Sequence, residues 1–326
     1  MLVDNFSRRF TYLRLSVTEA CNFRCNYCLP QGTDCSTSKR AQELTLPEIE
    51  NLVRAFARLG TRKIRITGGE PSLRHDLTEI IALCKSIPDI ETVALTTNGY
   101  RLQQDLPAWK AAGLDTLNVS IDSLDAARFE MITGHAKLHK ILEGLTLASQ
   151  LGIQQIKINA VLMRGFNDEA LEDFMQFVRS HALTLRFIEL MQTNDNLEFF
   201  QRHHLSGQHL IERLLAQGWQ ELPRELHAGP AREFYHADYR GRIGLIMPYS
   251  KDFCGSCNRL RVSSTGQLFL CLFADEHQHL RDLLQRPADQ QKLMDYLSKA
   301  VAGKAASHSL HDHKPGATRH LAMIGG

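Results

Sequence analysis

The chain has 326 residues, 43% hydrophobic and 23% charged, which suffices for one large domain with an extension or for two domains that share an interface. Its net charge of +2 is too small to suggest a nucleic-acid-binding protein, so local arginines must bind any anionic partner. The sequence contains no apolar run near the ~20 residues of a transmembrane helix and no hydrophobic secretory segment. We therefore expect a cytoplasmic protein that binds neither nucleic acid nor membrane.

Short β-rich runs alternate with helical patterns over the first two-thirds of the chain. The runs cover residues 12–17, 63–67, 92–96, 116–121, 156–162 and 183–189. The clearest helix begins at the capping-box sequence Thr45-Leu46-Pro47-Glu48 and ends at Gly60. Strands separated by helices predict a parallel sheet, and about six such units are too few for an eight-stranded barrel. We predict an α/β fold with a partial (β/α)6 TIM-like barrel, whose ligands gather at the carboxyl ends of the strands.

The alternation stops after about residue 195. A helical segment near 211–217, β-like pieces near 232–236, 243–247, 260–263 and 268–272, and two short helices follow. We therefore predict a barrel core at 1–225 and an α+β extension at 226–326. The last residues are rich in His, Gly and Ala, so we expect an irregular tail that is mobile unless it docks.

Six of the eight cysteines form two groups, which are Cys21, Cys25 and Cys28, and Cys254, Cys257 and Cys271. The cytosol keeps thiols reduced, so metal-bound thiolates are a better interpretation than disulfides. Cys84 lies in an apolar helical stretch and is expected in the core. Cys35 stands apart and matches no motif.

The first group has the spacing CxxxCxxC and follows the first predicted strand. Three closely spaced thiolates can bind three irons of a [4Fe–4S] cluster and leave the fourth iron open. Structural zinc sites usually take four ligands in paired CxxC units, so three cysteines favour the cluster. A zinc site or a group of buried cysteines stays open on spacing alone.

The second group is a CxxC pair followed by Cys271. His277 and His279 follow closely, so a zinc ribbon stays open here too. The segment Arg259-Leu260-Arg261-Val262 is predicted as a strand, whose period of two places both guanidinium groups on one face. Two aligned arginines suit a phosphate chain, although an isolated RxR is more often a solvated strand face.

The cysteine loop, with Tyr27 before its last cysteine, resembles the radical S-adenosylmethionine superfamily. The segment ITGGEP at 66–71 is similar to the GGEP element of that superfamily. The resemblance implies that the open iron chelates S-adenosylmethionine, and that an electron from the cluster cleaves it to a 5′-deoxyadenosyl radical. An electron donor is therefore an implied partner.

Further segments extend the resemblance along nearly the whole chain. They are YLRLS at 12–16, LTTNGY at 95–100, NVSID at 118–122, RFIELM at 186–191, DFCGSCNRLR at 252–261 and the terminal Gly-Gly. Together they resemble the GTP 3′,8-cyclases, which begin molybdenum cofactor biosynthesis. The resemblance implies a second [4Fe–4S] cluster that binds GTP, removal of the ribose 3′ hydrogen by the radical, and attack of the resulting carbon radical on guanine C8. The product, (8S)-3′,8-cyclo-7,8-dihydroguanosine 5′-triphosphate, would pass to a cyclic pyranopterin monophosphate synthase.

The resemblance also assigns residues. The implied S-adenosylmethionine contacts are Tyr27, Gly69, Glu70, Ser120 and Met191. The implied GTP contacts are Arg14, Arg65, Thr96, Lys157, Arg259, Leu260 and Arg261. The implied catalytic residues are Arg14, Arg259, Arg261, Gly325 and Gly326. Met191 alone would more often be a core residue, and a terminal di-glycine is usually frayed. However, two residues without side chains can enter a narrow active site, and cations on several predicted strands can converge on a triphosphate in the barrel interior.

Two other functions stay open. One is a peptide-modifying radical enzyme with an auxiliary cluster, although such extensions typically carry more cysteines. The other is a zinc-stabilised interaction module. The histidines at 308, 311, 313 and 320 are expected to be incidental, and a homodimer stays open as the assembly.

Overall fold

A single sheet of twelve strands dominates the computed structural model, which describes residues 1–32, 42–224 and 229–325. Its centre consists of six parallel strands in chain order. These strands are β1 (Tyr12–Ser16), β2 (Lys63–Thr67), β3 (Thr92–Thr97), β4 (Thr116–Ser120), β5 (Gln155–Leu162) and β6 (Thr184–Glu189). All six predicted strands are confirmed, and the six-unit sheet is open, as expected.

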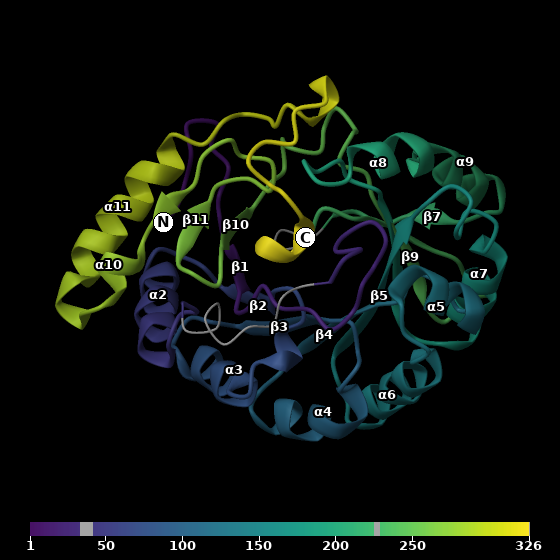
Figure 1. Ribbon diagram of the computed structural model, residues 1–326, viewed down its shortest axis with the longest axis horizontal. Helices are drawn as coiled ribbons and strands as arrows, with labels where there is room; N and C mark the ends of the chain where they lie inside the picture. Colours follow the sequence, from purple (N-terminus) through teal and green to yellow (C-terminus); the bar gives the residue numbers. More distant parts are fainter. Residues whose placement is uncertain (33–41, 225–228, 326) are drawn as a thin grey trace.

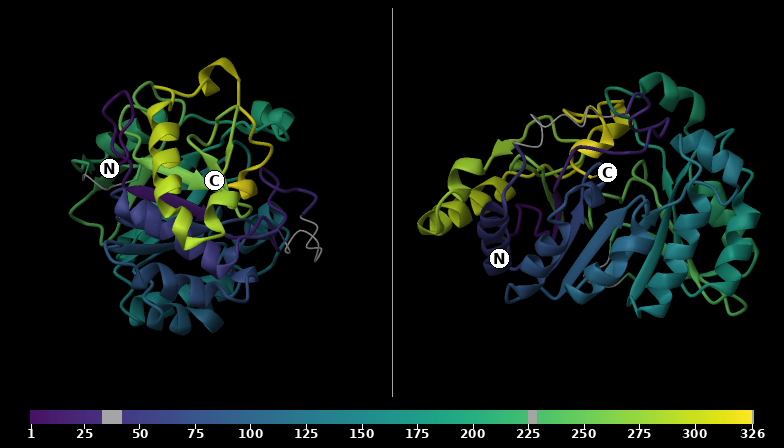
Figure 2. Two further views of the ribbon diagram at one scale, coloured as in Figure 1. Left: turned by 90° about the vertical axis from the view of Figure 1, so that its left-hand side faces the viewer. Right: turned by 60° about the horizontal axis from the view of Figure 1, so that its bottom comes forward.

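Helices cover the outer face of this sheet (Figures 1 and 2). They are α2 (Leu46–Arg58), α3 (Leu77–Ser86), α4 (Leu102–Ala111), α5 (Ala126–Thr133), α6 (Leu138–Gln150) and α7 (Leu171–Ser180). The predicted capping box of α2 is present, because the Thr45 hydroxyl accepts from the Glu48 amide and Glu48 accepts from the Thr45 amide. Cys84 on α3 is fully buried, which confirms its core position. Within the described ranges no helix is long and apolar enough to cross a membrane.

The C-terminal part of the chain extends the sheet at both edges. Strand β10 (Arg259–Val262) pairs in parallel with β1, and β9 (Arg242–Ile246) pairs in parallel with β6. Antiparallel strands continue from each, namely β11 (Gln267–Phe269), β12 (Gln278–His279), β8 (Arg232–Tyr235) and β7 (Gln220–Glu221). The extension therefore hydrogen-bonds to both edges of the central sheet, which would otherwise expose unpaired backbone groups.

The remaining helices flank the ends of this arc. They are α8 (Leu197–His203), α9 (Gln208–Ala216), α10 (Arg281–Leu284) and α11 (Gln290–Ala302), with 3-10 turns at Pro71–Leu73, Pro287–Asp289, Leu310–Asp312 and Leu321–Met323. Helices α10 and α11 pack beside α2. The C-terminal residues return to the middle of the arc, on the inner face of the strands (Figure 1).

The strand period of two separates an apolar outer face from a polar inner face. On β1, Leu13 and Leu15 are fully buried in the core under the helices, whereas Arg14 faces inward. Cross-strand register aligns the inward residues in rows, which are Arg259–Tyr12–Lys63, Arg261–Arg14–Arg65 and Thr96–Asn118–Lys157. The sheet thus carries three adjacent rows of mainly cationic and polar side chains on one face.

Candidate active site

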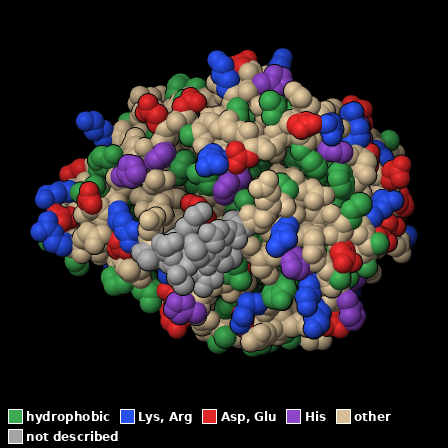
Figure 3. Space-filling model, in the orientation of Figure 1, with side chains coloured by type: hydrophobic (Ala, Val, Ile, Leu, Met, Phe, Trp, Pro, Cys, Tyr) green, Lys and Arg blue, Asp and Glu red, His purple; other side chains and the backbone are tan. Residues whose placement is uncertain are grey.

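A cavity of about 780 Å³ lies on the inner face of the sheet, within the range of roughly 300–1,000 Å³ typical of small-molecule sites. Seven basic side chains on the strands line it, namely Arg14, Lys63, Arg65, Lys157, Arg186, Arg259 and Arg261. On the part of the molecular surface shown in Figure 3, basic and acidic side chains are instead intermixed. The cavity differs from this surface because seven basic side chains are gathered in it.

Burial destabilises the charged forms of these groups. It is the largest cause of lowered pKa values for Arg14, to about 9, Lys63, to about 8, and Arg186 and Arg261, each to about 10. Neighbouring cations lower each pKa further. A polyanion in the cavity would relieve both effects, so the basic cluster is suited to a ligand with several negative charges.

Tyr12 lies in the first row, between Arg259 and Lys63, and next to the second row of cations. Its hydroxyl accepts a hydrogen bond from Arg65 Nε, and Arg65 Nη1 donates to Thr96 Oγ1 at 3.1 Å. Burial alone would raise the pKa of Tyr12, but Arg65, Arg14 and Lys63 outweigh it and lower the pKa to about 6. The predicted residues Arg65 and Thr96 are thus in contact.

Sequence reasoning assigned no role to Tyr12, Lys63 or Arg186. The strand period contained the signal for two of them, because Tyr12 and Arg14, like Lys63 and Arg65, are two residues apart and share a face. Arg186 begins the quoted RFIELM segment, and its Nε donates to Asn159 Oδ1 at 3.0 Å. Lys157 forms an ion pair with Glu233 on β8 at 3.1 Å.

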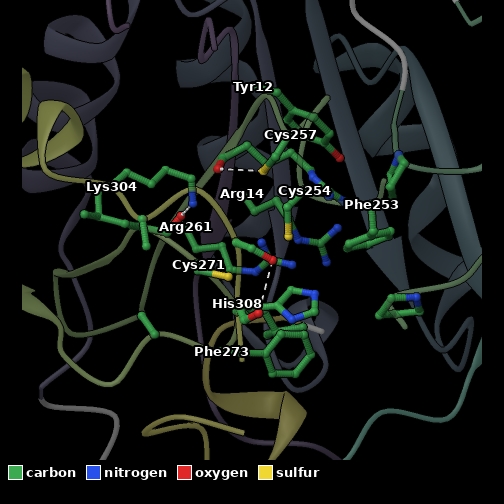
Figure 4. Close-up of a pocket in the computed structure, with 18 of the residues that line it drawn as sticks. Tyr12, Arg14, Phe253, Cys254, Cys257, Arg261, Cys271, Phe273, Lys304 and His308 are labelled. Carbon is green, nitrogen blue, oxygen red and sulfur yellow. Dashed lines mark hydrogen bonds between the residues drawn. The ribbon is translucent and has the colours of Figure 1, made fainter. Parts of the chain in front are cut away.

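The second cysteine group lines the same cavity (Figure 4). Burial would raise the pKa of Cys254, but hydrogen bonds from His308 and Ser307 outweigh it and lower the pKa to about 6. The pKa of Cys257 is also lowered, because Arg259 and Lys304 outweigh burial. These surroundings favour the thiolate, which is the form that binds a metal centre.

Arg259 and Arg261 on β10 both point into the cavity, whereas Leu260 between them packs in the core, as the strand period predicts. The Nε atoms of both arginines are buried without a hydrogen-bond partner in the described part of the chain. Buried donors of this kind call for an acceptor from a ligand. The site therefore fits an anionic group beside the second set of cysteines.

The first cysteine group occupies the loop after β1, at the carboxyl end of the strand, as predicted. Burial raises the pKa of Cys28 to about 11 and raises that of Cys25, with Asp122 acting in the same direction. Cys25 and Cys28 therefore favour the neutral thiol, which a coordinating metal deprotonates. In the described ranges no three Cys, His, Asp or Glu side chains are grouped to hold a single metal ion, and every cysteine is a free thiol. A cubane cluster instead binds each cysteine through a different iron, and a donor set of three cysteines in one loop is chemically suited to it.

The GGEP element packs tightly against the cysteine loop. A Cβ atom on Gly69 would lie 2.4 Å from the Ala20 carbonyl oxygen, so only glycine allows this approach. Glu70 is fully buried and accepts hydrogen bonds from the Thr97 hydroxyl at 2.7 Å and the Asn98 amide at 2.6 Å. Glu70 thereby holds the end of β3 next to the loop.

The other predicted S-adenosylmethionine contacts come from three elements around this loop. The Tyr27 hydroxyl donates to Asp122 Oδ2 at 3.0 Å, Ser120 ends β4 and is half-buried, and Met191 follows β6 and lines the cavity. Cys28 and Cys271 pack against one apolar cluster that includes Met191. Cys21, Cys25 and Cys28 do not line the cavity themselves. Because Cys28 and Cys271 both contact this group of apolar side chains, the group lies between the two sets of cysteines.

The C-terminal tail is docked in the site. Arg14 Nε and Nη2 donate to the Gly325 carbonyl, the former at 3.0 Å, and Ile324 is fully buried. A Cβ atom on Gly325 would lie 2.1 Å from Thr67 Cγ2, and its φ of +63° also favours glycine. Gly326 and Cys35 lie outside the described residues.

The tail histidines include one that is not an incidental surface residue. His308 is buried and contacts Cys254, whereas His277 stacks on Phe269. The sequence contained no signal for this contact, because it joins residues 54 positions apart in irregular structure.

Comparison with known proteins identifies two adjoining family matches. Residues 15–178 match the family described as Radical SAM superfamily, and residues 183–310 match Molybdenum Cofactor Synthesis C. A GTP 3′,8-cyclase of Psychromonas ingrahamii is 53% identical over 100% of this chain and 95% of its own length. One of Stenotrophomonas maltophilia is 55% identical over 100% of this chain and 99% of its own length. Among solved structures, Streptococcus suis SuiB bound to S-adenosylmethionine shares the fold, with a TM-score of 0.61 at 12% identity over 90% of this chain and 68% of SuiB.

Proposed function

The chain belongs to the GTP 3′,8-cyclase family, and we propose that its two sets of cysteines and the cavity between β1, β5 and β10 form one active site for that reaction. The chain is a radical S-adenosylmethionine lyase. It converts GTP to (8S)-3′,8-cyclo-7,8-dihydroguanosine 5′-triphosphate, the first step of molybdenum cofactor biosynthesis, with S-adenosylmethionine and two [4Fe–4S] clusters as cofactors. This family membership decides against the peptide-modifying enzyme and the zinc module.

In our proposal Cys21, Cys25 and Cys28 hold the radical-forming cluster. With S-adenosylmethionine bound, this centre supplies the 5′-deoxyadenosyl radical. Gly69 has no side chain and so allows the backbone to approach the methionine group. Glu70 fixes the GGEP loop by accepting a hydrogen bond from the Asn98 amide. Tyr27, Ser120 and Met191 complete the proposed contacts.

Cys254, Cys257 and Cys271 hold the second cluster beside the guanine ring in our proposal. The observation that carries this proposal is that one cavity is lined both by these cysteines and by seven basic strand residues. A triphosphate offers several acceptor oxygens to Arg65, Lys157, Arg259 and Arg261, while Thr96 supports Arg65 and Leu260 anchors the arginine strand in the core. Arg14 connects this site to Gly325, and we propose Gly326, which lies outside the described residues, as the other catalytic residue of the tail.

In our proposal, radical formation and substrate binding are assigned to two successive parts of the chain. Residues 1–225 form the radical-making core, and residues 226–326 supply the second cluster and the tail. Radical formation consumes one electron, so an electron donor is a required partner. A separate cyclic pyranopterin monophosphate synthase takes the product, and the reduced thiols suit the cytoplasm.

Anaerobic turnover tests the proposal. Reconstituted protein is incubated with GTP, S-adenosylmethionine and a strong reductant, and the products are identified by mass spectrometry and NMR. We expect 5′-deoxyadenosine and the cyclised nucleotide in equal amounts, and neither without S-adenosylmethionine. Formation of 5′-deoxyadenosine without consumption of GTP, by protein with full iron content, would contradict the assignment of the cavity to GTP.

A further inference from the structure

Asn118 on β4 is a cavity residue that the assignments above do not use. Its side chain lines the cavity and is 3% exposed. Its Oδ1 atom is buried and accepts no hydrogen bond from the described residues. Buried polar atoms in native proteins nearly always have a partner, and leaving one unpaired costs free energy comparable to a lost hydrogen bond. A ligand that enters the cavity can supply this partner.

Two neighbouring residues on β4 and β5 differ from Asn118 in this respect. Asn159 on β5 also lines the cavity, but its Oδ1 accepts from Arg186 Nε. Thr116, two residues before Asn118 on the same strand, has a buried hydroxyl without a partner among the described residues, but it does not line the cavity. Asn118 therefore combines an unpaired buried acceptor with access to the substrate space.

The sheet register places Asn118 between the two halves of the proposed site. It pairs with Thr96 on β3 and Lys157 on β5, so the three side chains lie in one row. Ser120, a proposed S-adenosylmethionine contact, lies two residues further along β4, about 7 Å towards the cysteine loop. The row thus lies between the residues that bind the phosphates in our proposal and those that bind S-adenosylmethionine. This is where the group attacked by the radical must lie.

The chemistry of GTP restricts what an acceptor oxygen can bind there. At neutral pH the triphosphate has essentially only acceptor oxygens. The donors of GTP are the guanine N–H groups and the two ribose hydroxyls. The proposed function places guanine beside the cysteines that flank β10, which is four strands from β4 in the sheet order. The ribose hydroxyls are therefore the donors of GTP that are left for Asn118 Oδ1.

We propose that Asn118 Oδ1 accepts a hydrogen bond from a ribose hydroxyl of bound GTP and so orients the sugar towards the radical-forming centre. This inference rests on the proposed function, because it takes GTP as the occupant of the cavity. Asn118 is thus a substrate-orienting residue, and it discriminates GTP from the deoxynucleotide that lacks the bound hydroxyl.

The test is a comparison of equilibrium binding without turnover. GTP, 2′-deoxy-GTP and 3′-deoxy-GTP are titrated into reconstituted protein without S-adenosylmethionine, using wild type, Asn118→Leu and Asn118→Ala. Of 2′-deoxy-GTP and 3′-deoxy-GTP, we expect wild type to bind the one that lacks the bound hydroxyl about five- to tenfold more weakly than GTP. This factor is the effect of one net hydrogen bond. Asn118→Leu should weaken GTP binding by a similar factor and remove the discrimination.

Thr116→Val is the matched control, because it also replaces a buried unpaired polar atom on β4 but does not reach the cavity. It should leave all three affinities unchanged. Asn118→Ala serves if the leucine variant fails to reconstitute, as judged by its iron content.

Two results would overturn this inference and leave the proposed function unaffected. In the first, an Asn118 variant weakens all three nucleotides equally, which indicates a phosphate contact or lost packing. In the second, it leaves GTP binding unchanged. If wild-type protein with full iron content bound no GTP, the proposed function would fail together with the inference.

Discussion

The two sets of cysteines lie in opposite electrostatic surroundings. Around Cys25 and Cys28, burial and the nearby Asp122 raise the thiol pKa values, in the case of Cys28 to about 11. Around Cys254 and Cys257, burial is outweighed by His308, Ser307, Arg259 and Lys304, and the pKa values fall, that of Cys254 to about 6. The local field therefore differs in sign between the two sites.

The difference matches the two roles. In the first set, Cys25 and Cys28 pack against an apolar group of side chains, where little charge from the protein stabilises a thiolate. The second set shares its cavity with basic side chains that suit an anionic substrate. We infer that the extension brings cysteines and cations together around β10 because the second centre must hold both a cluster and a polyanion.

Removing one ligand from each set should have the largest effect. Cys25→Ser should abolish reductive cleavage of S-adenosylmethionine and remove about half of the iron expected from two clusters. Cys257→Ser should remove the other half and impair GTP conversion, yet leave some uncoupled 5′-deoxyadenosine formation. Iron analysis and product quantification check both.

Cys84→Ala is the control for these variants, because Cys84 is a core residue outside both sets. It should keep the full iron content. Unchanged iron in either serine variant would show that the corresponding ligand set is wrongly assigned.

The docked tail provides the second test. Gly325→Ala should lower turnover by roughly 100-fold, because the new Cβ atom collides with Thr67 and displaces the carbonyl that Arg14 binds. Iron content and S-adenosylmethionine binding should remain intact. Gly165→Ala is the matched control, since its φ of +77° is similar but no atom lies within 4 Å of the new Cβ atom. Wild-type turnover of Gly325→Ala would exclude a role for this contact.

Removing the ion pair between Lys157 and Glu233 should have the smallest effect, a change in GTP affinity. Glu233→Gln should strengthen GTP binding by about two- to fivefold at low salt, because it frees the Lys157 ammonium and removes a negative charge near the triphosphate. Equilibrium titration measures the change. Glu221→Gln, which breaks the exposed pair with Arg232, should have no effect. Weaker binding by Glu233→Gln would show that the pair positions Lys157 for its ligand.

Local sequence patterns determined much of the fold and the two cysteine sets. Periods of 2 and 3.6 residues located the six core strands and α2, and the capping box placed the start of that helix. The cysteine spacings and the Arg259–Arg261 strand were likewise visible in short segments. Each of these features depends on residues close together in the chain, so the sequence alone expresses it.

Only the tertiary structure decided which of these segments meet. Arg14 lies beside Arg261, 247 residues later, because β10 pairs with β1, and the docked tail brings Gly325 to the same guanidinium. The strand period can place Tyr12 and Lys63 on the inner face, but their lowered pKa values and the contact of His308 with Cys254 depend on the cations and cysteines that the fold brings together. Strand pairing across such separations, and the pKa values it produces, depend on the packing of the whole chain. No spacing within a short segment encodes them.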